Sequence, residues 1–405
     1  MVSKSLYIKD VCSRFSSGKS ISASKIKKTG KYPVYGGNGI RGYTDTYNFD
    51  GECAVIGRQG AYCGNVRYFS GKGYMTEHAV VAVANQNNNT RFLAYKFALM
   101  NLGRYVGQSA QPGLSVETLL DVHIDVPSKP IQDNIANVLS TIDSQIENNN
   151  AICSDLEGMV KLLYDYWFVQ FDFPDENGKP YKSSGGNMVW NEKLKREIPA
   201  GWEVKTLRGL YEIERGISYT SDDIASGCGV PMINLACIDR NRNYRDGELK
   251  YFSGSVPNDS YLKAGDLLIA CTDLTRECEI IGCPILVPDD GNRYTYSMDI
   301  AKISFPSPSM NDLYMYMTLR TNFYHNYIKK WASGTNVLHL NLEGLDWYPV
   351  WLPPIDLQEK FARMIGDIHS KKSEILLENQ QLISLRDFLL PMLMNGQITV
   401  GKAGK

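Results

Sequence analysis

Two long stretches of the chain repeat apolar residues in mixed steps of three and four, the spacing of one helix face. They fall within residues 130–170 and 354–392. The repeating positions are Ile135, Leu139, Ile142, Ile146, Asn149, Ile152, Leu156, Val160, Leu163 and Trp167 in the first stretch, and Phe361, Ile365, Ile368, Lys372, Ile375, Asn379, Leu382, Leu385 and Leu389 in the second. The mixed steps are typical of a coiled-coil seam, in which the polar members Asn149, Lys372 and Asn379 would fix the register. The pattern predicts two helices of about 50 Å that pack on each other and on a partner.

The same phrase introduces both stretches. It reads "VPSKPIQDNIA" from Val126 and "LPPIDLQEKFA" from Leu352, so that Gln132 and Gln358 correspond at a separation of 226 positions. The same register aligns "LSVETL" (residues 114–119) with "LNLEGL" upstream of the second phrase. A match held over this length predicts two related halves, each with a globular unit followed by a long helix.

The regions ahead of the two helices have a different pattern. Short β-like runs such as "ECAVIG", "HAVVAVA", "GDLLIA" and "DIAKISF" alternate with turns rich in Gly and Asn. We therefore predict mixed α/β (α+β) globular units at residues 1–129 and 202–353. Residues 171–201, rich in Gly, Pro, Asn and Ser, indicate a connector, and residues 393–405 a C-terminal tail.

Aromatic residues crowd the end of the first helical stretch, in "YDYWFVQFDF" from Tyr164. A cofactor box is one interpretation, but a packing cap is favoured because aromatic side chains bury a large area per residue. We expect the helix packing to be carried by Ile142, Ile146, Leu156, Leu163, Trp167, Phe168, Ile368, Ile375, Leu382 and Leu389.

Charge is distributed unevenly along the 405 residues, although the formal net charge is only -1. Residues 1–110 hold fifteen Lys and Arg against five Asp and Glu, whereas residues 111–200 hold seven against fourteen. The first unit thus carries the charge expected of a protein that binds an anionic partner. Residues 201–340 are mildly acidic, so a similar role there must depend on local clusters.

Several catalytic signatures fail on inspection. Gly37, Gly39 and Gly42 have the dinucleotide-binding spacing, but β-branched, aromatic and turn residues follow where a helix would have to begin. "SGKS" at residues 17–20 resembles the end of a P-loop, but the position that needs the first P-loop glycine is occupied by Ser13. Nine cysteines and five histidines show neither paired nor metal-ligand spacing. We expect no catalytic residue, no metal and no cofactor in this chain, and, without an apolar run long enough to span a bilayer, a cytoplasmic protein.

The remaining candidates are residues that bind nucleic acid. Lys and Arg attract phosphates, and Arg, Asn and Gln can form bidentate contacts with base edges, Arg58 with guanine and Gln59 with adenine. In the first unit the candidates are Lys25, Lys27, Lys28, Lys31, Tyr35, Asn38, Arg41, Arg58, Gln59, Tyr62, Arg67, Gln108 and Gln111. In the second unit they are Arg215, Asn234, Arg240, Arg242, Asn243, Arg276, Asn336 and His339.

With these residues in view, the chain resembles the specificity subunit of type I restriction-modification systems. The resemblance rests on the duplicated Pro-x(3)-Ile/Leu-Gln phrase, "LLYDYWFVQF", "IPAGWEVKTL", "KYPVYGGNGIRGY" and "GECAVIGRQGAYCGNVRYF". It implies two target-recognition domains joined by two long antiparallel helices with approximate twofold symmetry. It also implies double-stranded DNA, two modification subunits and restriction subunits as partners, with S-adenosylmethionine, ATP and Mg bound by those partners.

The resulting hypothesis is a subunit that reads a bipartite, asymmetric DNA site. Two units that act on one face of B-DNA would be centred about 10 base pairs apart. If each reads 3 to 4 pairs, about 6 or 7 pairs between them stay unread. A coiled-coil scaffold with protein-binding ends is the alternative, favoured by the acidic second unit. A self-contained nuclease or methyltransferase is a third possibility, against which the missing motifs argue.

Overall fold

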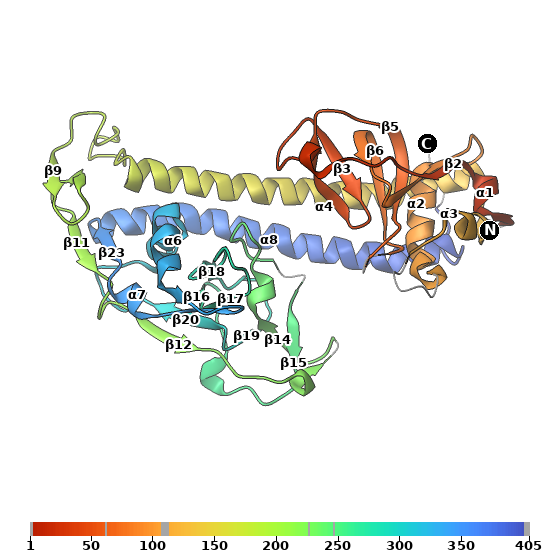
Figure 1. Cartoon of the computed structure of the whole chain (residues 1–405). Helices are drawn as coiled ribbons and strands as arrows, with labels where there is room; N and C mark the ends of the chain where they lie inside the picture. Colours follow the sequence, from red (N-terminus) through yellow and green to blue (C-terminus); the bar gives the residue numbers. More distant parts are fainter. Residues whose placement is uncertain (1–2, 61–62, 107–112, 226, 246–247, 401–405) are drawn as a thin grey trace. The chain divides into compact units, whose positions relative to one another are not determined.

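The computed structural model describes residues 3–60, 63–106, 113–225, 227–245 and 248–400 (Figure 1). The chain divides into two compact units: residues 1–148 with 379–405, and residues 149–378. Both divisions fall inside the long helices, so each unit contains a globular part and a portion of each helix.

A six-stranded sheet forms the body of the first unit. Neighbouring strands are antiparallel except for the parallel pair β3 and β6. The strands, in sheet order, are β2 (Cys12–Ser17), β7 (Ala79–Ala84), β5 (Phe49–Gly57), β6 (Val66–Met75), β3 (Tyr32–Gly36) and β4 (Gly39–Thr44). On β5, Ala54 and Ile56 belong to the core on one face, while Cys53 and Val55 belong to the core on the other. The predicted run "ECAVIG" is thus a central strand buried on both faces.

Helix α2 (Thr90–Leu99) packs against this sheet at β5, β6 and β7. A separate antiparallel ribbon joins the first strand of the chain, β1 (Lys4–Tyr7), to β8 (His123–Val126) just ahead of the first long helix. The short elements of the first unit are α1 (Ile8–Val11), η1 (Ala23–Lys25), η2 (Leu102–Tyr105) and α3 (Val116–Leu120).

The second unit is built from several smaller sheets. The strands of the first sheet, in sheet order, are β12 (Glu212–Arg215), β20 (Ile300–Ser304), β16 (Leu267–Ala270) and β18 (Pro284–Leu286). Those of the second sheet are β13 (Ile224–Ala225), β15 (Lys250–Phe252), β14 (Val230–Ile233) and β19 (Thr295–Tyr296). Those of the third sheet are β17 (Thr272–Asp273), β22 (Leu338–Leu340) and β21 (Ala332–Ser333). A ribbon of β11 (Glu203–Thr206) and β23 (Pro349–Leu352) precedes the second long helix, as β1 and β8 precede the first. The helical elements are α5 (Asp312–Arg320), α6 (Asn322–Ile328), α7 (Glu343–Asp346), η4 (Ser221–Asp223), η5 (Leu235–Cys237), η6 (Asn258–Ser260) and η7 (Lys329–Trp331).

The two long helices are α4 (Lys129–Tyr164), extended by a π-helical turn (η3, Asp165–Val169), and α8 (Ile355–Met394). They begin where the repeated prolines predict. The second helix ends at Met394, two residues beyond the predicted bound of 392, and Gly396 adopts a φ of 72° just beyond it. Leu393 and Met394 are buried in the core of the first unit, so this last turn is not part of a free tail.

Within each unit the helix segments run antiparallel. In the first unit Arg386 pairs with Asp143 at 3.2 Å, and in the second Lys372 pairs with Glu157. The predicted polar seam positions Asn149 and Asn379 are buried, as expected.

Two of the predicted seam positions are shifted by one residue in the structure. Ile152 is 39% exposed and Cys153 is buried instead, while Leu385 is 46% exposed and Arg386 takes the half-buried place. Both shifts restore the regular alternation of four- and three-residue steps, from Asn149 to Cys153 and from Leu382 to Arg386, so the buried face keeps the heptad where the apolar residues depart from it.

The aromatic run at the end of α4 is a packing cap, as favoured above. Tyr164, Trp167 and Phe168 are at most 4% exposed and surround Phe361 of α8. Phe171 and Phe173 continue this core into the predicted connector. That segment also contains a hairpin of β9 (Met188–Asn191) and β10 (Arg196–Pro199), so it is structured rather than a simple linker.

The described part of the chain contains no helix both long and apolar enough to cross a membrane. In the same residues no cluster of three or more His, Cys, Asp or Glu side chains could hold a metal ion.

Candidate nucleic-acid interface

The glutamine of the repeated phrase anchors each globular unit to its long helix. The Gln132 side chain is fully buried; its Nε2 donates to Pro127 O at 2.8 Å and its Oε1 accepts from the backbone N–H of Asn89 at 2.9 Å. Asn89 in turn caps α2 by accepting from Phe92 N at 2.9 Å. The start of α4 and the start of α2 are therefore held by one amide.

Gln358 makes the same contacts in the second unit. Its Nε2 donates to Pro353 O at 2.8 Å, and its Oε1 accepts from the backbone N–H of Asn311 at 3.0 Å. Asn311 caps α5, accepting from Leu313 N at 3.0 Å. Because both amides are buried and fully bonded, each anchor fixes a globular unit on the helix that follows it.

The β3–β4 hairpin of the first unit brings together several of the predicted base-reading residues. A Cβ at Gly36 would meet Arg41 Cδ at 2.4 Å, and one at Gly39 would meet Arg67 Nε at 3.1 Å, so both arginine side chains lie against the glycine turn. Asn38 is exposed between these glycines. The glycines of the apparent dinucleotide motif thus belong to a hairpin, with strand rather than helix after them.

Gln59 joins the same surface. A Cβ at Gly37 would lie 3.0 Å from Gln59 O, which places the loop after β5 beside the hairpin turn. The exposed Asn38, Arg41, Gln59 and Arg67, here called the hairpin surface, supply the guanidinium and amide groups that read base edges.

Arg58 and Tyr35 have other contacts. Arg58 Nε donates to Leu114 O at 3.0 Å and its Nη1 to Ser17 Oγ at 3.0 Å, so each parallel N–H pair of the guanidinium already has one nitrogen bonded within the fold. Tyr35 is half-buried against Phe69, and burial raises the pKa of its hydroxyl. Three predicted residues, Tyr62, Gln108 and Gln111, lie outside the described residues.

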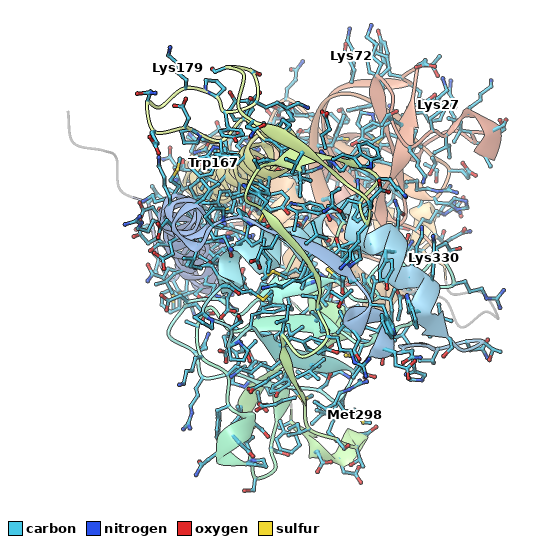
Figure 2. All side chains as sticks on the ribbon, turned by 90° about the vertical axis from the view of Figure 1, so that its left-hand side faces the viewer. Lys27, Lys72, Trp167, Lys179, Met298 and Lys330 are labelled. Atoms are coloured by element: carbon cyan, nitrogen blue, oxygen red, sulfur yellow. The ribbon has the colours of Figure 1, made fainter. Side chains whose placement is uncertain are left out.

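Lysines cover the segment that leads into β3. Lys25, Lys27, Lys28 and Lys31 are all exposed, and Lys27 pairs with Asp45 at 2.6 Å. Lys72 also projects from this unit and lies 5.0 Å from the centroid of the Tyr47 ring (Figure 2). The sequence reasoning did not include Lys72, which stands between two glycines within strand β6.

In the second unit, Arg276, Asn336 and His339 come together through strand pairing. Asp273 at the start of the Arg276 loop pairs with Leu338, and Thr272 pairs with His339. The buried Asp273 carboxylate accepts from the backbone N–H groups of Thr275, Ile280 and Ile281, which holds the loop in place. All three predicted side chains are exposed and form the second candidate surface.

Lys330 projects from η7, the short turn that follows α6 in the same unit (Figure 2). Arg215 and Arg240 are also exposed. Arg215 donates to Met298 O at 3.2 Å, and Arg240 pairs with Glu279 at 3.4 Å.

The assignment of Asn234 to DNA binding is wrong. Asn234 is 4% exposed and caps η5, accepting from Ala236 N at 2.9 Å while its amide donates to Glu248 O at 3.1 Å. A side chain enclosed in this way cannot reach a base edge. Arg242 and Asn243 are half-buried and bond to Asn322 and Arg320, so they line a cavity rather than the second candidate surface.

Residues 3–157 and 199–385 match a family model described as the type I restriction modification DNA specificity domain, and each matched segment contains one glutamine anchor. The chain belongs to this family. It is 26% identical over 329 residues to the type I restriction enzyme MjaIX specificity subunit of Methanocaldococcus jannaschii, which covers 77% of this chain and 69% of that subunit. The type I restriction enzyme EcoprrI specificity subunit of Escherichia coli is 44% identical over 131 residues, covering 31% of this chain and about a third (33%) of that subunit.

A solved type I restriction-modification S subunit from M. genitalium shares the fold. Its TM-score is 0.61 at 16% identity, with 97% of this chain and 96% of that chain covered. The expected fold class of this specificity subunit, two mixed α/β units with two long helices, is therefore confirmed.

Proposed function

We propose that this specificity subunit reads a bipartite, asymmetric DNA site, one part with each globular unit. The duplicated anchor at Gln132 and Gln358 carries the proposal, because it ties two differently built units to the same kind of helix. The hairpin surface and the second candidate surface present different side chains, so the two half-sites should differ in sequence. Two units on one face of B-DNA would leave about 6 or 7 base pairs unread between them.

The exposed amides and guanidinium groups support sequence reading, and the lysines support phosphate contact. Asn38, Arg41 and Gln59 can form the bidentate contacts that distinguish bases, whereas Lys25, Lys28 and their neighbours supply attraction that does not depend on sequence. This division of roles agrees with membership of a DNA specificity family.

We further propose that modification subunits dock on exposed apolar positions of the long helices. On α4 in the second unit, Met159 and Leu162 are 57% and 70% exposed; on α8 in the first unit, Phe388 is 55% exposed. Met159 and Leu162 are three residues apart and therefore share one face of α4, and neighbouring exposed apolar side chains mark surfaces that another protein covers. Catalysis, with S-adenosylmethionine, ATP and Mg, would then take place on the partner subunits, in the cytoplasm.

Methylome sequencing of cells with and without the gene tests the DNA role. A bipartite methyl-adenine mark that disappears with the gene supports the proposal, and an unchanged methylome contradicts it. Co-purification tests the assembly: a methyltransferase subunit at about twofold excess is expected, and a complex without one would favour a scaffold that binds other proteins.

A further inference from the structure

The second unit contains a partly open cavity of about 590 Å³ that the DNA-reading role does not use. It lies between the C-terminal half of α4, α5, β23 and the first half of α8, all within residues 149–378. Small-molecule sites in proteins usually measure about 300–1,000 Å³, so the cavity can take a ligand larger than a single ion.

The wall of this cavity is rich in cations. Among the described lining residues, Lys161, Arg196, Arg242, Arg320 and Lys372 face only two carboxylates, Glu157 and Asp165, and Glu157 is already paired with Lys372.

Arg320 and Arg242 are held by neutral acceptors. Arg320 donates to Tyr316 OH at 3.0 Å and to Asn243 Oδ1 at 2.7 Å, and Arg242 donates to Asn322 Oδ1 at 2.7 Å. Within the described part of the chain, neither guanidinium forms an ion pair with a carboxylate. Both charges are therefore available to an anion in the cavity.

Two buried nitrogens on the same wall lack a hydrogen-bond partner. Trp351 is 5% exposed, and its indole Nε1–H has no acceptor. His369 Nε2 is also unpartnered, and its ring is held edge-on against Tyr316 with centroids 5.8 Å apart. A buried donor left unsatisfied costs about 1–3 kcal/mol, so a ligand that brings oxygen acceptors would relieve this cost.

Burial, followed by the charges of Lys372 and Arg320, lowers the pKa of His369 to about 4. The imidazole is therefore neutral near pH 7, and the tautomer protonated at Nε2 can donate a hydrogen bond from that nitrogen. Apolar side chains also line the cavity, among them Val160, Met317 and Phe323.

We propose that this cavity binds a small organic anion, with a phosphate or carboxylate head bound by Arg320, Arg242 and the Trp351 N–H, and a flat apolar body against the apolar wall. The guanidinium groups recognise the oxyanion, and the volume beyond them accommodates the body.

The first unit lacks this constellation. In the register of the repeat, Asp125, Asp143 and Ile146 stand where the second unit has Trp351, His369 and Lys372. When α2 and α5 are aligned at the asparagines that cap them, Ala94 corresponds to Tyr316 and Ala98 to Arg320. Asp143 there binds Tyr95 and Arg386. The shared architecture therefore does not require the cationic cavity, which is specific to the second unit.

Calorimetric titration of the full chain tests the site with three probes that share one ring system: 1-naphthyl phosphate, 1-naphthoate and neutral 1-naphthalenemethanol. At least one anion should bind about tenfold or more tightly than the alcohol, since hydrogen bonds to charged groups contribute about 1.5–3 kcal/mol. The preferred anion identifies the oxyanion.

Variants locate the binding. Arg320→Gln should weaken the preferred anion about tenfold or more, and Trp351→Phe, which keeps an aromatic ring but removes the N–H, should weaken it severalfold. Arg293→Gln removes a charge of the same unit outside the cavity lining and should bind like the parent. Circular dichroism verifies folding, and Arg242→Gln replaces Arg320→Gln if that variant does not fold.

Three results would overturn the proposal. They are equal affinity for alcohol and anions, no binding of either anion at millimolar concentration, and an affinity loss in Arg293→Gln that matches the loss in the cavity variants. None of these readouts involves DNA, so the inference stands or fails independently of the proposed function.

Discussion

The side chain of Gln358 accepts a hydrogen bond from the backbone N–H of Asn311, 47 residues upstream, at 3.0 Å. Gln132 and Asn89 repeat this relationship over 43 residues at 2.9 Å. In both units the glutamine lies in the first turns of a long helix, and the asparagine caps a helix of the globular part. One buried amide therefore sets the position of a globular unit relative to the helix that follows it.

Replacing this glutamine should destabilise its unit. Gln358→Leu leaves Asn311 N, Ser309 O and Pro353 O without their side-chain partner, and the loss of buried hydrogen bonds predicts a decrease of about 2–4 kcal/mol in the free energy of unfolding. Urea denaturation monitored by circular dichroism measures this decrease in the free energy of unfolding. The matched control is Gln381→Leu at an exposed site on the same helix, and equal midpoints for the two variants would contradict the anchoring role.

Lysines ahead of β3 should act on phosphates. The double variant Lys27→Gln with Lys28→Gln is expected to weaken DNA binding uniformly across sequences. It should reduce the salt slope of log K by up to about 1.8, because each phosphate contact contributes about 0.9. Fluorescence anisotropy over a salt series measures the slope. Lys179→Gln, a projecting lysine of the second unit, serves as control (Figure 2), and a loss confined to one DNA sequence would argue against phosphate contact.

The hairpin surface should read bases. Arg41→Gln or Arg67→Gln is expected to cost about 1–3 kcal/mol on the preferred half-site and to relax preference at one position there. Binding selection on randomised DNA would show the change. A uniform loss over all sequences, with the preference intact, would reassign these arginines to the phosphates.

Helix length should set the spacing between half-sites. Removing one heptad from both α4 and α8 shortens each by about 10 Å, equivalent to about three base pairs. The unread gap should decrease accordingly, or modification should be lost. Methylome sequencing of a strain carrying the shortened gene measures the gap, and methylation with the original gap would rule out a ruler role for the helices.

Acid should destabilise the second unit through its buried histidines. Burial, followed by neighbouring cations, lowers the pKa of His369 and of His325 to about 4, below the ordinary value of 6.5. The unfolded chain therefore binds more protons than the folded one between these values, and the free energy of unfolding should fall as the pH drops from 6.5 towards 4. Denaturation midpoints at pH 7 and pH 5 measure the change. His369→Gln should flatten the dependence, and an unchanged slope would show that other groups cause it.

Local pattern was sufficient to predict the long helices, the repeat and several strands, because periodicity and proline placement act over a few residues. The run "ECAVIG" became β5, and the aromatic run after Tyr164 became part of a core. The helix seam is correct at Asn149 but shifted by one residue at Ile152, because the buried face follows the heptad to Cys153 although the apolar side chain stands one position earlier.

The site was harder to predict, since a polar loop residue has the same local signature whether it faces solvent or the interior. Asn234 caps a buried turn, and Arg58 is engaged by Leu114 and Ser17, whereas Asn38, Arg41 and Arg67 remain exposed. These outcomes depend on strands and loops that lie far apart in the chain.

By itself, the sequence determined that this protein has two related halves, each with a long helix introduced by Pro and Gln, because hydrophobic periodicity and backbone restriction are local. Only the tertiary structure decided that the glutamine bonds to an asparagine more than forty residues away, which polar side chains are exposed, and that Arg320, His369 and Trp351 line one cavity. Burial and hydrogen bonding depend on which distant segments come into contact, and no local pattern contains that information.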